Sequence, residues 1–413
     1  MGIYHIFLYT GIAGIVLTLI LTLIRRPENA ILDILKNWMG SLFIFSGVVK
    51  AIDPLGTAYK ISEYFEVLHL TFLEPFCTEL SVAMIVLEIV LGVAMIIGWQ
   101  SRLTYIVTFL LLIFFTFLTG FTYLSGWDLK TLTFDATKMK VTSCGCFGDF
   151  IKLEPRLSFI KDLILIVAGL VLIIFSKRIK DVFKNKWIGN GIVIVSTVFT
   201  LWFCLRNYVW NEPIVDFRPY KIGVNIKEDR TPKKPPVLEM QFVYKNKKSG
   251  KSESFGLKNL PADLADNWEF VERKDKVLDP GIPAKILDFM IQHQGEDITE
   301  DILNNPDYSF AVVAYDIHKT KTSAIKDKIN PFMEKARLAG YDVFGVSQNA
   351  DSSFLKANAI KYPFYFGDAV FLKTIGRGNP VILELRDGVI MNKWHWAKFP
   401  SWEEVAKDLN SNP

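Results

Sequence analysis

The first half of the chain is a series of long apolar runs separated by short polar stretches. A helix needs about 20 mostly apolar residues to cross the roughly 30 Å hydrocarbon core of a bilayer. Six runs come close to that length or exceed it, and after Leu205 none of that length recurs. The pattern predicts a polytopic α-helical membrane bundle with about six spans, for which the lipid bilayer is a partner. The predicted spans are Ile3–Ile24, Leu35–Ile52, Phe76–Trp99, Leu103–Leu124, Leu157–Phe175 and Trp187–Leu205.

Basic residues gather in alternate loops between these runs, and this sets an expected orientation. Short cytoplasmic loops carry an excess of Lys and Arg. If the three basic loops are cytoplasmic together, the N-terminus, the loop 125–156 and everything after Leu205 lie outside. We therefore expect a multi-pass protein of the bacterial inner (cytoplasmic) membrane whose N-terminus and C-terminal domain are periplasmic. The basic residues are Arg25, Arg26 and Lys36, then Arg102, and then Lys177, Arg178, Lys180, Lys184 and Lys186.

The composition agrees with a membrane part joined to a soluble part. Of the 413 residues 50% are hydrophobic, and the net charge is only +4. So small a charge leaves no electrostatic footprint for nucleic acid, which we exclude as a partner. The chain has 4 cysteines, too few for a disulfide-stapled scaffold. The histidines show no metal-ligand spacing, so no metal site is predicted.

Residues 210–290 are predicted to form a linker and a β-rich connecting region between a membrane domain (1–209) and a last domain (291–413). The stretch Asn211–Pro236 is polar and rich in proline, which is typical of an extended tether. The segments "VLEMQFVYKN" and "ESFGLK" then indicate two strands on either side of the turn "KNKKSG".

Strands and helices alternate from residue 284 to the end of the chain. Strands are predicted at "AKILDFMIQ", "FAVVAYDI" and "YDVFGVSQ", and helices at "EDITEDILNN", "SAIKDKINPFMEKARLAG" and "DSSFLKANAI". "PVILELRDGVIMNKWHW" indicates a hairpin that turns at Asp387-Gly388. A helix capped by Ser401 closes the chain. The expected order is β-α-β-α-β-α-β-β-α.

This order resembles the thioredoxin fold, in particular its TlpA-like branch, over residues 295–409. The segment "RGNPVILELRDG" is similar to the thioredoxin segment in which a cis-proline opens the antiparallel hairpin, and Pro380 matches that proline. The resemblance implies an α/β thioredoxin-like soluble domain beside the membrane bundle.

One departure from the thioredoxin pattern bears on function. Thioredoxins carry Cys-x-x-Cys between the apolar strand and the long helix, whereas this chain has "YDIHKTKTSAIK" there. The thiolate is the redox nucleophile, so this domain cannot perform disulfide exchange alone. We predict that it docks a partner through the surface around Pro380 and His318. A repurposed active site that uses His318 or Thr320 is the alternative.

The sharpest chemical feature is Cys144-Gly145-Cys146, in the loop after the fourth run. Two cysteines separated by one residue can bond only across a sharply bent backbone, and Gly145 lowers the cost of that bend. Strained disulfides exchange readily, so the pattern favours an exchangeable pair over a structural turn. A thiolate site for zinc or an iron–sulfur cluster is a further alternative, although its usual spacing is Cys-x-x-Cys. Cys77 and Cys204 lie at the predicted outer ends of their spans.

Two segments of the membrane half resemble the DoxX/MauE family of redox-associated membrane proteins, over about residues 35–180. They are "GSLFIFSGVVKAIDP", with Gly47, Lys50 and Pro54, and "SCGCFGDF", which is similar to the Cys-x-Cys-Phe-Gly loop of MauE-type members. The resemblance implies a part in extracytoplasmic thiol–disulfide chemistry.

The mechanistic hypothesis is a membrane-embedded thiol–disulfide redox protein that acts on periplasmic proteins. A dithiol substrate docks on the cysteine-free domain and passes electrons to Cys144–Cys146. Cys77 and Cys204 either form a second pair that relays the electrons or are structural. The final acceptor is a membrane quinone, by analogy with membrane disulfide oxidases.

Glu88, near the middle of the third predicted span, is a further candidate because ionisable groups at that depth usually serve a function. It is expected either to move protons coupled to quinone chemistry or to lock helix packing. The alternative for the whole chain is a non-catalytic, membrane-anchored module that presents the thioredoxin-like domain to an envelope partner.

Overall fold

The computed structural model of the chain divides into two compact units, Met1–Arg218 and Pro219–Pro413. It describes residues 3–24, 28–128, 133–134, 139–141, 144–179, 181–261 and 263–411.

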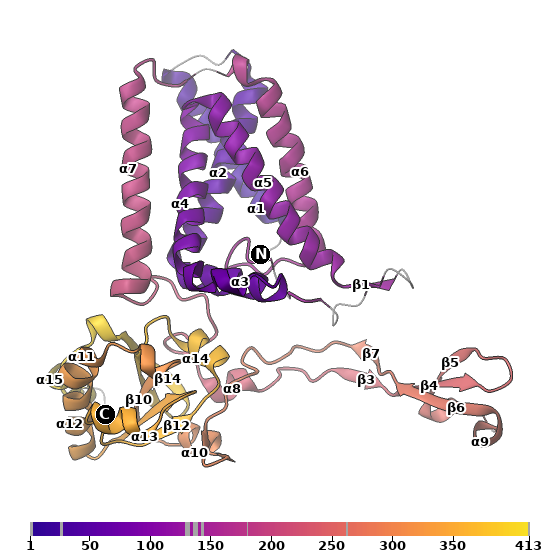
Figure 1. Cartoon of the computed structure of the whole chain (residues 1–413), viewed down its shortest axis with the longest axis vertical. Coiled ribbons are helices and arrows are strands. Elements are labelled where there is room, and N and C mark those ends of the chain that lie inside the picture. Colours follow the sequence, from indigo (N-terminus) through magenta and orange to yellow (C-terminus); the bar gives the residue numbers. More distant parts are fainter. Residues whose placement is uncertain are drawn as a thin grey trace. The chain divides into compact units, whose positions relative to one another are not determined.

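The first unit is a bundle of long apolar helices (Figure 1). Within the described residues, 6 helices are long and apolar enough to cross a membrane. This confirms the predicted bundle of about six spans. The spanning helices are α1 (Ile3–Ile24), α2 (Ala30–Ile52), α4 (Cys77–Ile97), α5 (Ser101–Leu124), α6 (Pro155–Ile174) and α7 (Lys186–Leu205).

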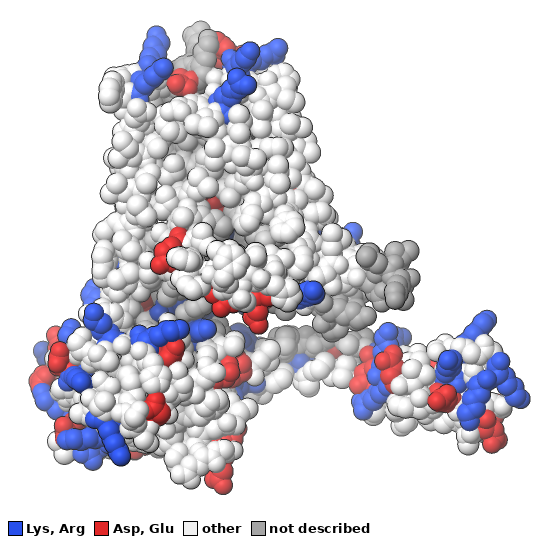
Figure 2. Space-filling model, in the orientation of Figure 1, with Lys and Arg blue, Asp and Glu red and all other residues white. Residues whose placement is uncertain are grey.

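The flanks of the bundle present apolar side chains, as a lipid-facing surface requires. Figure 2 shows these flanks almost free of charged residues, with Lys and Arg gathered at one end. The exposed basic residues at that end include Lys177, Arg178 and Lys184. Of the other basic residues used to predict the orientation, Arg25, Arg26 and Lys180 lie outside the described residues.

Helices α2 and α4 approach closely because glycines meet at their interface. A Cβ atom on Gly92 would lie 2.7 Å from the carbonyl oxygen of Gly40, and a Cβ on Gly40 would lie 2.8 Å from that of Gly92. Small residues let backbones pack at this distance in membrane helices, where dispersion contacts drive association. This contact fixes the distance between the two helices that carry the buried residues Lys36, Lys50 and Glu88.

Two helical segments between α2 and α4 were not predicted. They are α3 (Pro54–Val67), which lies across the end of the bundle in Figure 1, and the 3₁₀ segment η1 (Thr71–Phe76). Asp53 caps α3 by accepting from the Gly56 amide at 3.0 Å, and Pro54 occupies the first helical position. The segment is too short and too polar to register as a span.

The second unit is built on a seven-stranded mixed sheet with the order β14-β13-β10-β11-β12-β8-β9. Strand β10 pairs parallel to β11 and antiparallel to β13, and a cis Asn379-Pro380 bond opens β13. The arrangement confirms the thioredoxin-like expectation. The strands are β8 (Gln292–His293), β9 (Glu296–Asp297), β10 (Tyr308–Ala314), β11 (Asp342–Ser347), β12 (Phe364–Phe366), β13 (Val381–Arg386) and β14 (Val389–His395).

Helices pack on this sheet and form two apolar cores with it. The predicted N-cap residues Asp351 and Ser401 both accept hydrogen bonds from the first turns of their helices. The helices are α8 (Ile226–Arg230), α10 (Thr299–Leu303), α11 (Thr322–Ala324), α12 (Asn330–Leu338), α13 (Ser352–Ala357), α14 (Ala369–Ile375) and α15 (Trp402–Ser411).

Two predictions for this unit are wrong. The stretch Ala284–Gln292 is not a strand except at its last residue, because the Lys285 and Ile286 amides donate to the carbonyl of Asp229 rather than to a sheet partner. Its apolar side chains fill the core instead, which explains the misleading pattern. The stretch Asn211–Pro236 is not a free tether, because Tyr220 and Ile226 are fully buried in that core.

The two strands predicted around the turn "KNKKSG" are present, the first of them broken into β3 and β4, and β6 and β7 were not predicted. Strand β3 (Val237–Glu239) pairs with β7 (Lys276–Asp279), and a three-stranded sheet has the order β5-β4-β6. The strands of that sheet are β4 (Gln241–Asn246), β5 (Ser252–Gly256) and β6 (Trp268–Arg273).

We predict that Gly92→Val lowers the free energy of unfolding by about 1 to 3 kcal/mol, because the new side chain would force α2 and α4 apart. Gly191→Val, in α7, is the matched control, since a Cβ there has nothing within 4 Å. Thermal unfolding of both variants in detergent micelles measures the difference. Equal losses in the two variants would show that the Gly40–Gly92 contact does not hold the helices.

Candidate functional site

The loop that carries the two candidate cysteines is folded onto the end of the bundle. Phe147, Ile151 and Leu153 are buried in the same apolar core as the helices and anchor the loop. Gly145 has a φ of +66°, a conformation that glycine adopts without strain, and a turn follows in which the Gly148 amide donates to the Gly145 carbonyl at 3.1 Å. The sharp bend predicted at Gly145 is therefore present.

The thiols of Cys144 and Cys146 are free and hydrogen-bonded to each other, and the Cys144 thiol donates to Ser158 Oγ at 3.0 Å. The hydrogen bond from Cys146 lowers the pKa of Cys144 to about 6, and Ser158 and the charge of Lys161 act in the same direction against burial. That hydrogen bond and burial raise the pKa of Cys146 well above its usual range. The pair thus has one acidic thiol and one that keeps its proton.

Both cysteines open onto an apolar cavity of about 580 Å³. The walls come from α2, α3, η1, α4 and α5, with the cysteine loop and the start of α6 on one side. Lining side chains include Ser46, Lys50, Lys60, Ile61, Tyr64, Phe65, Leu73, Leu80, Ala83, Met84, Leu87, Leu111, Phe115, Leu118, Thr119, Cys144, Cys146 and Lys161. The volume lies within the range of small-molecule sites, which are mostly apolar with a few placed polar groups.

Glu88, predicted as a functional acid, forms a buried ion pair with Lys50 beside this cavity. Lys50 Nζ lies 2.5 Å from Glu88 Oε1, and the two side chains are 3% and 1% exposed. Ser46 Oγ lies 2.8 Å from Glu88 Oε2 and 3.1 Å from the carbonyl oxygen of Cys146. One network therefore links the acid in α4, the lysine in α2 and the backbone of the cysteine loop.

A second buried ion pair was missed by sequence reasoning. Lys161 and Asp162, in the second turn of α6, bond to each other, and Thr119 of α5 donates to Asp162 at 2.9 Å. Lys161 Nζ also lies over the ring of Phe147, 5.8 Å from its centroid. Two adjacent charged residues near the end of a predicted span suggest exposure to solvent. Their burial becomes visible only once the cysteine loop is seen to fold over them.

Cys77 and Cys204 are buried at the same end of the bundle but do not line this cavity, as far as the described residues show. Cys204 packs in an apolar cluster with Ala51, Val82 and Ile85. Their part in an electron relay stays a prediction. Within the described residues, no group of three or more His, Cys, Asp or Glu is arranged to hold a metal ion.

In the second unit the structure brings the cis-proline next to the segment that replaces Cys-x-x-Cys. Asn379, which precedes Pro380, donates to the carbonyl of Asp316 at 2.7 Å. His318 is 51% exposed and its Nε2 lies 3.0 Å from Asp351 Oδ2. Both residues proposed for docking thus belong to neighbouring segments.

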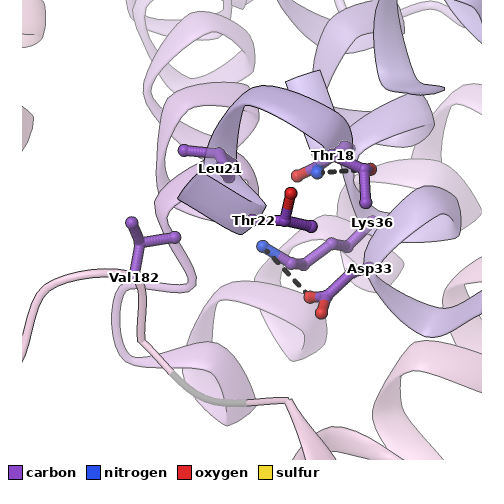
Figure 3. A pocket seen from close by; sticks show the side chains of 7 residues that line it. Thr18, Leu21, Thr22, Asp33, Lys36 and Val182 are labelled. Carbon is purple, nitrogen blue, oxygen red and sulfur yellow. Dashed lines mark hydrogen bonds and ion pairs between the residues drawn. The ribbon is translucent and has the colours of Figure 1, made fainter. Parts of the chain in front are cut away.

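A small hollow lies at the end of the bundle away from the cysteine loop, and its size and lining indicate a packing defect rather than a ligand site (Figure 3). It measures about 20 Å³, the size of a single water molecule. Beside it Lys36 donates to the carbonyl of Ile96 at 2.8 Å and pairs with Asp33 at 3.5 Å. A cation at the carboxyl end of α4 is favoured by the helix dipole.

Comparison with known proteins bears on both units. Residues 28–175 match the family described as methylamine utilisation protein MauE, a match that covers α2 to α6 and the cysteine loop. The membrane bundle is thus similar to that family. Residues 238–279 match a domain of unknown function, DUF8463. No curated protein matches the chain.

One similar solved structure is the solution structure of a Bacteroides thetaiotaomicron protein described as a disulfide isomerase. It is 16% identical, covers 30% of this chain and 84% of that chain, and has a TM-score of 0.24. So low a score adds nothing to the fold, which the strand order itself defines. The chain therefore joins a MauE-like membrane bundle to a thioredoxin-like domain without Cys-x-x-Cys.

We predict that alkylation of Cys144 by iodoacetamide has its pH midpoint at about 6, because that is the pKa of Cys144 in the hydrogen-bonded pair. Below the midpoint the thiol is protonated and reacts slowly with iodoacetamide, and above it the thiolate reacts quickly. Peptide mass spectrometry after timed alkylation measures the profile. Cys146→Ala removes the first cause of the shift and should raise the midpoint. A midpoint of about 8.5, as in an unperturbed thiol, would contradict the described geometry.

Proposed function

We propose that this protein is a membrane thiol–disulfide oxidoreductase that oxidises periplasmic dithiols and passes the electrons to a membrane quinone. The observation that carries the proposal is the Cys144–Cys146 pair, which opens onto a cavity of about 580 Å³ inside the membrane bundle. The similarity of residues 28–175 to the MauE family supports a membrane setting for this chemistry.

The reaction balances in two steps. In the first, a substrate dithiol reduces the Cys144–Cys146 disulfide through a mixed disulfide, so that the substrate gains a disulfide and the protein holds two thiols. In the second, the two thiols lose two electrons and two protons and reform the disulfide. The quinone accepts both electrons and both protons and leaves as a quinol.

The cavity suits a quinone because of its wall and its position. A quinone has a flat apolar ring and an isoprenoid tail, and the wall is formed mainly by Leu, Phe and Met side chains. The carbonyl oxygens of the ring need hydrogen-bond donors in an apolar site. Lys50 and Lys161 supply charged donors at the wall that the cysteines share.

In this proposal the thioredoxin-like domain is the part of the protein that binds the substrate protein. Without cysteines it cannot exchange disulfides, but the surface around Pro380 and His318 remains as a place for an extended substrate segment. We assign this domain and the N-terminus to the periplasm, because basic residues such as Arg102 and Lys177 lie in the loops at the other end of the bundle.

The deciding experiment follows the redox state of each cysteine in proteoliposomes, by alkylation with a mass tag after rapid acid quench. With a short-tailed quinone present, the reduced Cys144–Cys146 pair should reoxidise while one quinone is consumed per dithiol. Cys144→Ser and Cys146→Ser should each abolish quinone consumption in a folded protein. A pair that stays oxidised, or stays reduced and indifferent to quinone, would leave a membrane-anchored binding module as the function.

The same assay assigns Cys77 and Cys204. A relay through a second pair predicts that Cys77→Ser and Cys204→Ser each stop reoxidation of Cys144–Cys146 by quinone. A structural role predicts normal reoxidation in both variants, with at most a lower unfolding temperature.

Filling the cavity should separate the two half-reactions. Ala83 lines it, so we predict that Ala83→Phe lowers the rate of quinone-dependent reoxidation by about tenfold or more, since bulk in a close-packed wall displaces the ligand. Exchange with a substrate dithiol should continue. Val167→Phe, at a side chain that is 63% exposed on α6, is the matched control for added bulk. Equal rates in the two variants would place the quinone elsewhere.

A further inference from the structure

One buried cation at the cysteine loop lies close enough to the thiols to act on them as well as on a bound quinone. Lys161 is 5% exposed and lines the same cavity as Cys144 and Cys146. A lysine that deep in a membrane bundle costs free energy unless it is paired, and even a paired one seldom adds stability over an apolar residue. Stability alone therefore does not explain why a lysine is present at this position.

Three side chains at the start of α6 face the cysteine loop together. Ser158, Lys161 and Asp162 are separated by three and four positions, so they share one face of the helix. Ser158 Oγ lies 3.0 Å from the Cys144 sulfur, within hydrogen-bond distance of the thiol or the thiolate. Lys161 Nζ lies over the ring of Phe147, 5.8 Å from its centroid. The same turn of helix thus approaches Cys144 and the residue that follows Cys146.

Asp162 holds the ammonium in this position. It is fully buried, bonds to Lys161 and accepts a second hydrogen bond from Thr119 at 2.9 Å. A carboxylate fixed from two helices leaves the lysine little rotational freedom. Because the ammonium has three N–H donors, it can keep this bond and still face a second anion.

The other charged groups around the loop are committed elsewhere. Lys60 of α3 bonds to Glu63, and its stem packs over Gly145, where a Cβ would lie 2.8 Å from Lys60 Cγ. Lys50 bonds to Glu88 of α4 and lies over the ring of Phe115. Tyr64 of α3 shares a hydrogen bond with Thr122 at 2.7 Å, and burial raises its pKa above the usual range. The charge of Lys161 acts on both sulfurs.

We propose that Lys161, held in place by Asp162 and Thr119, supplies a positive charge that adds to the stabilisation of the reactive thiolate of the Cys144–Cys146 pair. The inference rests on the proposed function for its meaning in turnover, since a thiolate is the form that attacks a disulfide. Lys161 is a positioning and charge-stabilising residue in this scheme. Its effect on the reactivity of the thiols can be measured without a substrate or a quinone.

The test compares the pH profile of Cys144 alkylation in the full-length protein and in Lys161→Met. Loss of a nearby cation should move the midpoint upward by about 1 pH unit, less than Cys146→Ala does, and slow alkylation at neutral pH by about twofold. Lys161→Arg keeps the charge and should retain most of the acidic midpoint. An unchanged midpoint in folded Lys161→Met would overturn the proposal.

Removing one partner of a buried pair can unfold a protein, so a second variant is needed. Lys161→Met combined with Asp162→Asn removes both charges and keeps the volumes similar. It should show the same upward shift as Lys161→Met, and an acidic midpoint in this variant would equally overturn the proposal. Lys36→Met is the matched control, because Lys36 is as buried and also paired but lies at the other end of α2.

The outcome is separable from that of the proposed function. A midpoint that depends on Lys161 in a protein whose thiols ignore quinone would retain this inference and remove the oxidoreductase. Quinone-dependent reoxidation with a midpoint indifferent to Lys161 would do the reverse.

Discussion

The buried ion pair between Lys50 and Glu88 is the interaction on which the site depends. It joins α2 to α4 where membrane lipid offers the charges no solvation, and breaking such a pair costs about 3 to 5 kcal/mol. Ser46, one turn before Lys50, connects the same carboxylate to the backbone of Cys146. The position of the thiols is thereby tied to the packing of the helices, and the glycine contact between α2 and α4 sets the distance over which this network can form.

Much of the architecture could be predicted from the sequence because it follows from periodicity. Spans are recognised by length and hydropathy, and the thioredoxin-like order by alternating buried strands and amphipathic helices. The failures have one cause, namely that tertiary contacts reassign residues whose local pattern is ambiguous. Ala284–Gln292 reads as a strand because its apolar residues face a core, yet its Lys285 and Ile286 amides donate to the carbonyl of Asp229 in α8.

The candidate site was predicted in part, for a related reason. Cys144, Cys146 and Glu88 stand out by residue type and position alone. The cavity could not be predicted in this way, because it forms only when α3 lies across the bundle and the cysteine loop folds over the start of α6. Lys161 and Asp162 acquire their meaning only from that fold, and no spacing rule would have paired them with the thiols.

The absence of cysteine between Asp316 and Lys326 separates two tasks that a thioredoxin combines in one surface. In the proposed reaction the redox pair lies in the membrane bundle, so the docking surface would be free of the constraints that electron transfer imposes. Substitutions around Pro380 can then change which proteins are recognised without altering the reduction potential. In evolutionary terms the domain would then be an exchangeable adaptor, whose substitution could change the partner while the redox pair in the membrane stays the same.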